Sequence, residues 1–233
     1  MKDNRTQLKH LQEQIIRCTK CSRLVEWREK VAKEKVRRFA DEDYWGKPIP
    51  SFGDFEAKLL LVGLAPAAHG GNRTGRIFTG DRSGDWLFDT LHRFGFANQS
   101  DSSARGDGLA LHNCYITAAL RCAPPQNKPK KEEKENCFPY LLQELQLLPN
   151  LQVVLALGKI GFDTVLKAYQ EIGQADFDRR PKFGHGHESK LNQQIVLLAS
   201  YHPSQQNTFT GKLTQPMFDA VFKRAKEIMS GNG

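Results

Sequence analysis

The sequence predicts an α/β protein, a three-layer α/β/α sandwich with helices on both faces of a parallel sheet. Four short apolar runs begin at Lys58, Tyr115, Gln152 and Gln194, and their hydrophobicity is continuous rather than alternating. Continuous runs are typical of strands buried on both faces, as in a parallel sheet. A helical pattern follows each run. Alternating strands and helices predict this architecture, with the active site at the carboxyl ends of the strands.

Two helices are expected before the first strand, within residues 1–50. Leu8, Leu11 and Ile15 repeat at helical spacing, and their pattern runs into a CxxC pair. The second helical pattern carries a basic run between residues 30 and 38. A solvated helix face is the simpler interpretation of that run.

The remaining chain completes the sandwich without any internal repeat or long linker, so one domain covering residues 1–233 is expected. Later helical patterns and two exposed loops are predicted from periodicity and from polar, glycine-containing composition. The helices are expected at residues 83–96, 132–148, 158–169 and 216–229, and the loops at residues 97–108 and 173–192.

Composition limits the class of partner. The chain has 233 residues, 39% hydrophobic and 26% charged, with a formal net charge of +8. This charge favours a polyanionic partner, but charge alone does not separate DNA, RNA, anionic lipid and acidic protein. No apolar run approaches the roughly 18 residues that a membrane span needs. The N-terminus lacks the apolar core of a signal peptide, so a cytoplasmic protein without membrane association is expected.

A glycine-rich loop, "GLAPAAHGGNRTGRIFTGD", follows the first predicted strand and lies at the ligand-binding edge of the sheet. Glycines let a backbone approach a ligand closely. Asn72, Arg73, Thr74 and Arg76 supply donors suited to phosphate oxygens. Neither GxGxxG nor GxxxxGK[ST] is present, which argues against a nucleotide-dependent transferase.

Two further residues stand at positions where a sheet enzyme keeps its catalytic groups. Asp81 precedes the helix expected near Ser83; a helix cap is the simpler interpretation and a catalytic carboxylate the alternative. His202 directly follows the last strand and precedes the polar run "SQQNTFT". A catalytic histidine is favoured there over a histidine that merely satisfies the core.

The cysteines form a third group. Cys18 and Cys21 make the CxxC pair, and Cys122 and Cys137 lie about a hundred residues further on. Four thiolates of this kind could hold zinc or an iron–sulfur cluster, and spacing does not decide between them; a redox pair is the alternative for CxxC alone. Cys114 is expected to behave as a small buried hydrophobe.

Three segments together resemble a known family. Residues 63–87 and 201–214 resemble the two signature motifs of the family 5 uracil-DNA glycosylases, and "YITAALRCAPPQNKP" resembles that family's middle segment. The resemblance extends over nearly the whole chain. It implies a four-stranded parallel sheet between helices and a [4Fe–4S] cluster that anchors residues 1–50. The implied cluster ligands are Cys18, Cys21, Cys122 and Cys137.

The resemblance also implies an activity. A monomeric enzyme of this family would flip uracil, or another deaminated base, out of double-stranded DNA and hydrolyse its N-glycosidic bond. Asp81 would orient water or stabilise the cationic sugar, and His202 would hydrogen-bond uracil O2. Asn127 matches a third position implicated in activity. A non-catalytic iron–sulfur module that senses DNA damage is the alternative function.

The resemblance assigns further residues to substrate binding. Phe78 would stack on the flipped base, and the segment from Ser204 to Leu213 would enter the minor groove. The expected substrate-binding residues are Gly63, Ala65, Asn72, Arg73, Phe78, Ser204 and Asn207.

Two alanines are informative because related families carry polar residues in their places. Ala65 stands where relatives use Asp or Asn to position water, and Ala118 where family 4 enzymes use Asn to read uracil. The loss of a polar reader relaxes discrimination, because specificity depends largely on buried polar groups left unpaired by the wrong substrate. A substrate range that includes hypoxanthine is therefore expected. No lysine within the two motifs is an evident Schiff-base nucleophile, although Lys212 is close enough to test.

Overall fold

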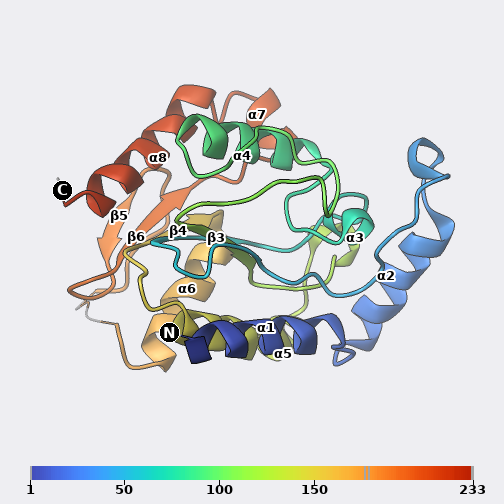
Figure 1. The fold of residues 1–233 in the computed structure, drawn as a ribbon, viewed down its shortest axis with the longest axis horizontal. Coiled ribbons are helices and arrows are strands. Elements are labelled where there is room, and N and C mark those ends of the chain that lie inside the picture. The colour runs from blue at the N-terminus through green and yellow to red at the C-terminus, as the bar shows by residue number, and fades with distance from the viewer. Residues whose placement is uncertain (1, 176, 178, 232–233) are drawn as a thin grey trace.

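The computed structural model describes residues 2–175, 177 and 179–231 and has the predicted layered α/β architecture (Figure 1). Its sheet has six strands in the order β1-β3-β2-β4-β6-β5. The strands are β1 (Phe52–Gly53), β2 (Leu59–Gly63), β3 (Cys114–Ala118), β4 (Val153–Leu157), β5 (Glu188–Lys190) and β6 (Val196–Ser200).

The four central strands are parallel and coincide with the four apolar runs. The expectation of only four strands is wrong at the edges, where β1 and β5 pair antiparallel with their neighbours. Both edge strands are short and partly exposed, so they carry no apolar run that the sequence could reveal. Strand β5 lies in the segment predicted as a loop between residues 173 and 192.

Helices cover both faces of the sheet. In Figure 1, α4 and α8 lie on one side and α1, α5 and α6 on the other. The helices are α1 (Lys2–Ile16), α2 (Ser22–Glu34), α3 (Gly71–Thr74), α4 (Arg82–Arg93), α5 (Lys131–Leu147), α6 (Lys159–Glu171), α7 (Gln205–Phe209) and α8 (Gln215–Met229), with 3-10 turns at Arg37–Phe39 and Pro125–Asn127. None of the helices described is long and apolar enough to cross a membrane.

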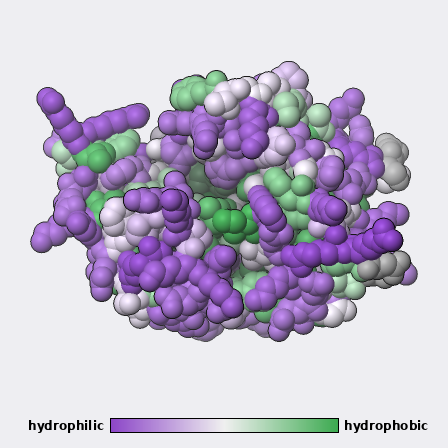
Figure 2. All heavy atoms as spheres, turned by 180° about the vertical axis from the view of Figure 1, so that it is seen from behind, coloured by the Kyte–Doolittle hydropathy of each residue, from purple (hydrophilic) through white to green (hydrophobic). Residues whose placement is uncertain are grey.

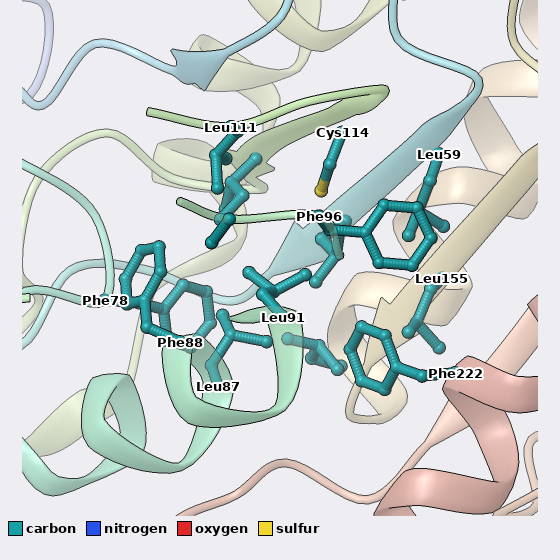
Figure 3. Packing of buried hydrophobic residues seen from close by; sticks show 14 of the residues in the cluster. Leu59, Phe78, Leu87, Phe88, Leu91, Phe96, Leu111, Cys114, Leu155 and Phe222 are labelled. Carbon is teal, nitrogen blue, oxygen red and sulfur yellow. The ribbon is translucent and has the colours of Figure 1, made fainter. Parts of the chain in front are cut away.

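The central strands are hydrophobic on both faces because each face has its own core. In β2, Leu59 and Leu61 join the core under α4 and α8, whereas Leu60 and Val62 join the core under α5 and α6. Figure 3 shows the first of these cores, in which Phe222 of α8 packs near strand side chains. Continuous hydrophobicity therefore indicated burial on two sides, as expected.

Cys114 also lies in this first core, fully buried, as the sequence analysis expected of a small hydrophobe (Figure 3). The outer surface has the opposite character. The face seen in Figure 2 is mostly hydrophilic, with apolar residues in small groups between charged side chains.

A buried polar cluster ties helix α1 to the sheet. Glu144 of α5 is fully buried and accepts hydrogen bonds from Arg121 at 2.5 Å and Thr117 at 2.6 Å. Gln12 of α1 donates to its other oxygen at 3.1 Å, and Ser51 does so at 2.5 Å. Buried charge of this kind is tolerated when its hydrogen-bonding capacity is filled, and breaking one partner is costly. The cluster fixes the chain beside Cys122.

Candidate active site

A cleft of about 1210 Å³ opens at the carboxyl ends of the parallel strands. It brings together segments that are far apart in the chain, and Asp81 and Asn127 both line it. Its other lining residues include Trp27, Arg38, Phe39, Glu42, His69, Gly70, Arg73, Asp101, Ser103, Gln126 and Gln205. The sheet edge predicted to carry the site is therefore the edge that carries the large cleft.

Asp81 is a helix cap, and it also lines the cleft. As the N-cap of α4, its side chain accepts a hydrogen bond from the Gly84 N–H at 3.0 Å, so the cap is confirmed. Burial raises the pKa of the Asp81 carboxyl, and hydrogen bonds from Gly84 and Ser83 offset part of that shift. Asp81 also lines the cleft, next to Gly80 and Arg82.

Three glycines in and next to the loop leave room for other atoms of the protein. They are Gly70 and Gly80 of the loop and Gly84 of α4. A Cβ atom on Gly70 would lie 2.2 Å from Asp81 Oδ2, and one on Gly80 would lie 2.3 Å from an Arg73 nitrogen. A Cβ on Gly84 would lie 1.9 Å from the Phe78 carbonyl oxygen. At these three positions the missing side chain makes room for other atoms of the protein. The glycines allow the loop to close on its own side chains.

Arg73 and Arg76 are likewise not free for phosphate. Arg73 pairs with Glu42 and donates to the His69 carbonyl at 2.9 Å and the Gly80 carbonyl at 3.0 Å. Arg76 makes a two-pronged pair with Asp107 at 2.6 and 2.8 Å. Both guanidinium groups are buried and paired within the protein, so in this conformation neither is free to bind phosphate, and the expected phosphate role stays a prediction.

Asn72, expected among the substrate-binding residues, is also committed elsewhere. It is 1% exposed, and its amide donates to the Arg28 carbonyl at 3.2 Å. Asn72 therefore joins the loop to α2, and its side chain does not face the cleft in the described structure.

Phe78 and His202 form a stacked pair beside the cleft. Their ring centroids lie 5.6 Å apart at an interplanar angle of 28°. Phe78 adopts a φ of 52°, which costs a side-chain-bearing residue on the order of 1 kcal/mol and is typical of functional sites. Gly63 allows this placement, because a Cβ atom there would lie 2.9 Å from the Phe78 ring.

The stack restricts the expected role of Phe78. The ring is only 6% exposed, and His202 covers one of its faces. Within the described part of the chain, neither of these two residues lines the large cleft. A base can stack on Phe78 only through its other face or after His202 has moved.

His202 is held as a neutral group. Burial lowers the pKa of its imidazole to about 4, so near neutral pH one ring nitrogen carries a proton and can donate a hydrogen bond. Its carbonyl accepts from the Asn207 amide at 2.8 Å and from the Ser204 N–H at 2.7 Å. Ser204 and Asn207, expected to touch substrate, thus fix the turn that carries His202.

Asn127 lies at the rim of the cleft in a left-handed turn. Its φ is 56° and that of Gln126 is 54°, so two consecutive residues other than glycine occupy a sparsely populated conformation. Such residues concentrate at binding and catalytic sites because the surrounding fold must hold them there. The segment "PPQNKP" gave no sign of this backbone geometry.

The four predicted ligand cysteines do converge. Cys18, Cys21, Cys122 and Cys137 line one small enclosed cavity together with Arg28 and Arg121. Arg28 Nη1 donates to Cys122 Sγ at 3.1 Å. Burial raises the pKa of Cys122 to about 12, partly offset by Arg28. Among the described residues, no group of three His, Cys, Asp or Glu side chains is arranged to hold a single metal ion.

Comparison with known proteins shows the family of the chain. The family model described as "Uracil DNA glycosylase superfamily" matches residues 50–226. A type-5 uracil-DNA glycosylase of Mycobacterium leprae is 48% identical over 219 residues, 94% of each chain. One of Thermus thermophilus is 48% identical over 214 residues, 91% of this chain and 93% of the relative. The chain belongs to the type-5 uracil-DNA glycosylases.

The relation to type-4 uracil-DNA glycosylases is more distant. A type-4 enzyme of Pyrobaculum aerophilum is 28% identical over 191 residues, 82% of this chain and 85% of the relative. In this type-5 chain, Ala118 is 2% exposed, and Ala65 packs against the cluster that contains Cys122 and Cys137. Neither alanine offers a polar group, so water and base must be handled by other side chains.

One pair in the type-5 cleft was missed by the sequence analysis. His69 lines the cleft, and its Nδ1 lies 3.0 Å from the Tyr44 hydroxyl. Burial and the nearby Arg73 lower the pKa of His69. The signal was visible, since His69 is the only histidine of the glycine-rich loop. Tyr44 could not be associated with it, because 25 residues separate them.

Proposed function

We propose that this protein is a DNA-repair glycosylase that flips uracil out of double-stranded DNA and hydrolyses its N-glycosidic bond, leaving an abasic site. The support is the type-5 similarity over more than nine tenths of both chains, joined to a cleft with a buried carboxylate at the carboxyl edge of the sheet. A non-catalytic damage-sensing module is not favoured by these comparisons.

DNA is held chiefly by positive charge. The net charge of +8 and the exposed lysines and arginines around the end of α2 suit a phosphate backbone. Arg38 also lines the cleft and is exposed, unlike the paired Arg73 and Arg76. Affinity is therefore expected to fall steeply with salt. The proposed form is a monomer that acts in the cytoplasm.

Asp81 is proposed to act on the sugar side of the reaction. Breaking the C1′–N1 bond builds positive charge on the sugar, and a carboxylate in a partly buried cleft stabilises such charge more strongly than one in water. The Gly84 and Ser83 N–H groups hold this carboxylate in a fixed direction. The same oxygens can orient the attacking water, with Asn127, which also lines the cleft, as a second polar partner.

His202 is proposed to act on the base side. A departing uracil carries negative charge, and a neutral imidazole N–H can donate to its O2 without first losing a proton. The low pKa of His202 keeps the ring in this neutral form. Removing one such donor typically costs about 10²- to 10³-fold in rate.

A [4Fe–4S] cluster is proposed for the cavity of Cys18, Cys21, Cys122 and Cys137. Four cysteines facing one enclosed space suit an iron–sulfur cluster, which is held by thiolates. Among the described residues, the Nε atoms of Arg28 and Arg121 are buried without hydrogen-bond partners. Buried cations of this kind offset the negative charge of ligated thiolates, so the residues present fit the group.

If the cluster is bound, its iron–thiolate bonds would join the turn between α1 and α2 to the chain after β3 and to α5. Glycosidic hydrolysis needs no electron transfer, so the proposed contribution is stability of the cleft wall. Iron and sulfide analysis with the visible spectrum tests it. Cys137→Ser is expected to lower the iron content and the Tm, and a full complement of cluster in that variant would contradict the assignment.

The substrate range is proposed to extend beyond uracil. Ala65 and Ala118 place methyl groups where related families present polar readers, and a site without buried polar readers discriminates weakly. Duplexes with uracil, hypoxanthine or ethenocytosine in one sequence context measure the range. Excision of uracil alone would refute this part of the proposal.

The central test is release of free base from a uracil duplex by wild type, Asp81→Asn and His202→Ala. Asn caps helices as well as Asp does, so Asp81→Asn keeps the fold while removing the charge. Each variant is expected to lose about 10²-fold or more in rate while still binding DNA. DNA binding by wild type without any base release would instead support the damage-sensing alternative. Borohydride should trap no covalent adduct, at Lys212 or elsewhere.

A further inference from the structure

His185 lies in the segment that the sequence predicted to be an exposed loop, and it contacts Tyr201, the residue before His202. Its ring is half-buried and contacts two other elements. Nδ1 lies 3.2 Å from the Tyr201 backbone nitrogen, and Nε2 lies 3.3 Å from the Met217 carbonyl oxygen at the start of α8. The imidazole therefore links Tyr201 to helix α8.

The partners define which ring nitrogen carries the proton. A backbone N–H only donates, so Nδ1 must accept from Tyr201; a carbonyl only accepts, so Nε2 must donate to Met217. The neutral tautomer with its proton on Nε2 satisfies both contacts. Ser200 Oγ lies 3.4 Å from the same Nδ1 and donates to the Tyr201 carbonyl at 2.9 Å, which restrains the next peptide, between Tyr201 and His202.

His185 also restrains the side chain of Tyr201. The two rings are stacked, with centroids 5.1 Å apart and an interplanar angle of 27°. Both the peptide nitrogen and the ring of Tyr201 are thus held by one imidazole. The next residue along the chain is His202, whose ring stacks on Phe78.

We propose that His185 is a positioning residue for His202: it fixes the Tyr201 peptide so that the His202 ring is directed toward the base. The inference rests on the proposed role of His202 and goes beyond it. His185 does not line the cleft in the described structure, and its link to His202 runs through Tyr201.

The charged groups near His185 do not give it an electrostatic role. Arg224 of α8 lines the same small cavity as His185, and its guanidinium is paired with Glu188 of β5 and Glu227 of α8. Lys212 lies 4.9 Å from the Tyr201 ring centroid. No carboxylate in the described part of the chain makes an ion pair with His185, so its contribution is geometric.

The neighbouring histidine gives a matched control. His187 lies two residues away, is exposed, and its ring contacts the Lys182 carbonyl at 3.1 Å. It shares the segment and the chemistry of His185, but within the described part of the chain its ring makes no hydrogen bond or ring contact with Tyr201 or α8. Of these two neighbouring histidines, His185 therefore positions the residue before His202, and His187 does not.

Single-turnover excision from a uracil duplex, with DNA affinity measured separately, tests the proposal. His185→Phe keeps the ring and loses both hydrogen bonds, and is expected to slow excision about 10- to 100-fold with little change in affinity, because misplaced catalytic groups are costly. His185→Gln keeps an acceptor and a donor and is expected to recover most of the rate. His187→Ala is expected to match wild type. His185→Leu replaces the Phe variant if that variant does not fold.

A double-mutant cycle separates positioning from general stability. If His185 acts through His202, His185→Phe should cause no further loss in a His202→Ala background, whereas independent effects would add. Additive losses, or a wild-type rate in folded His185→Phe, would overturn the inference. A wild-type rate in His202→Ala alone would instead overturn the proposed role of His202, so the two failures are distinguishable.

Discussion

The two motifs that flank the site are held by different kinds of interaction. The glycine-rich loop is fixed by buried charge, chiefly the pair between Arg76 and Asp107, whose side chains are 5% and 11% exposed. The segment after β6 is fixed by short hydrogen bonds around the His202 carbonyl and leaves Phe209 65% exposed. Buried pairs are expensive to break, whereas local hydrogen bonds contribute about 1 kcal/mol each. The loop is therefore expected to cost more to rearrange than the segment after β6.

The largest effect should follow from breaking the buried pair of the loop. Arg76→Met leaves Asp107 buried without its partner and is expected to lower the free energy of unfolding by about 3–5 kcal/mol. Arg73→Met is the comparison within the same loop, and its loss should be smaller because the partner Glu42 is 46% exposed. Chemical denaturation measures both. Equal losses of unfolding free energy in the two variants would show that burial of the partner carboxylate does not determine the size of the loss.

The next effect should come from filling the space beside Asp81. Gly70→Ala would place a methyl group 2.2 Å from Asp81 Oδ2, so the carboxylate must move. Displacement of a catalytic group by about 1 Å can cost roughly 100-fold in rate. Single-turnover excision should fall by that order while DNA affinity is retained. An unchanged rate would mean that the loop is less rigid than its packing indicates.

A substitution in the exposed segment after β6 should cost little stability but should slow excision from duplex DNA. Phe209→Ser removes a large apolar side chain that rests near Arg82, whose guanidinium lies 4.3 Å from the ring centroid. Little stability should be lost, because the ring is mostly exposed. Excision from duplex DNA should fall about tenfold if an apolar wedge helps to unstack the target, whereas excision from single-stranded DNA should not change. Equal losses on both substrates would contradict a role in opening the duplex.

The smallest effect concerns acid stability. Burial raises the pKa of Asp107, but hydrogen bonds from Arg76 and from the Leu109 and Ala104 N–H groups outweigh it and hold that pKa well below its ordinary value. A carboxyl with a depressed folded-state pKa contributes stability above its unfolded pKa of about 4, and this contribution is lost as the pH falls toward the folded value.

Asp81 has the opposite sign, since its raised pKa means that its ionised form costs stability above the unfolded pKa. Thermal unfolding of Asp107→Asn and Asp81→Asn between pH 3 and 7, a window spanning the ordinary Asp pKa of about 4, measures both contributions. Asp107→Asn should lower the Tm most near pH 7, and Asp81→Asn should raise it there by a few degrees. Parallel curves for the two variants would contradict the assigned signs.

Much of the fold and part of the site were accessible from the sequence. The four parallel strands were predicted because burial on two faces leaves a continuous apolar run, as in Leu59 to Val62. The cap at Asp81 followed from local helix chemistry. The grouping of Cys18 and Cys21 with Cys122 and Cys137 was implied by the resemblance, and the structure brings them to one cavity.

Tertiary structure alone decided what those residues contact. The sequence offered Arg73, Arg76 and Asn72 as ligands for phosphate, but Glu42, Asp107 and the Arg28 carbonyl already occupy their donors. A donor's partner depends on which distant side chain folds against it, and local spacing carries no information about that. The same reason applies to His185, whose partners at Tyr201 and Met217 are set by the packing of β6 and α8. Residue types determined which chemistry was available, and long-range packing determined which groups remain free to perform it.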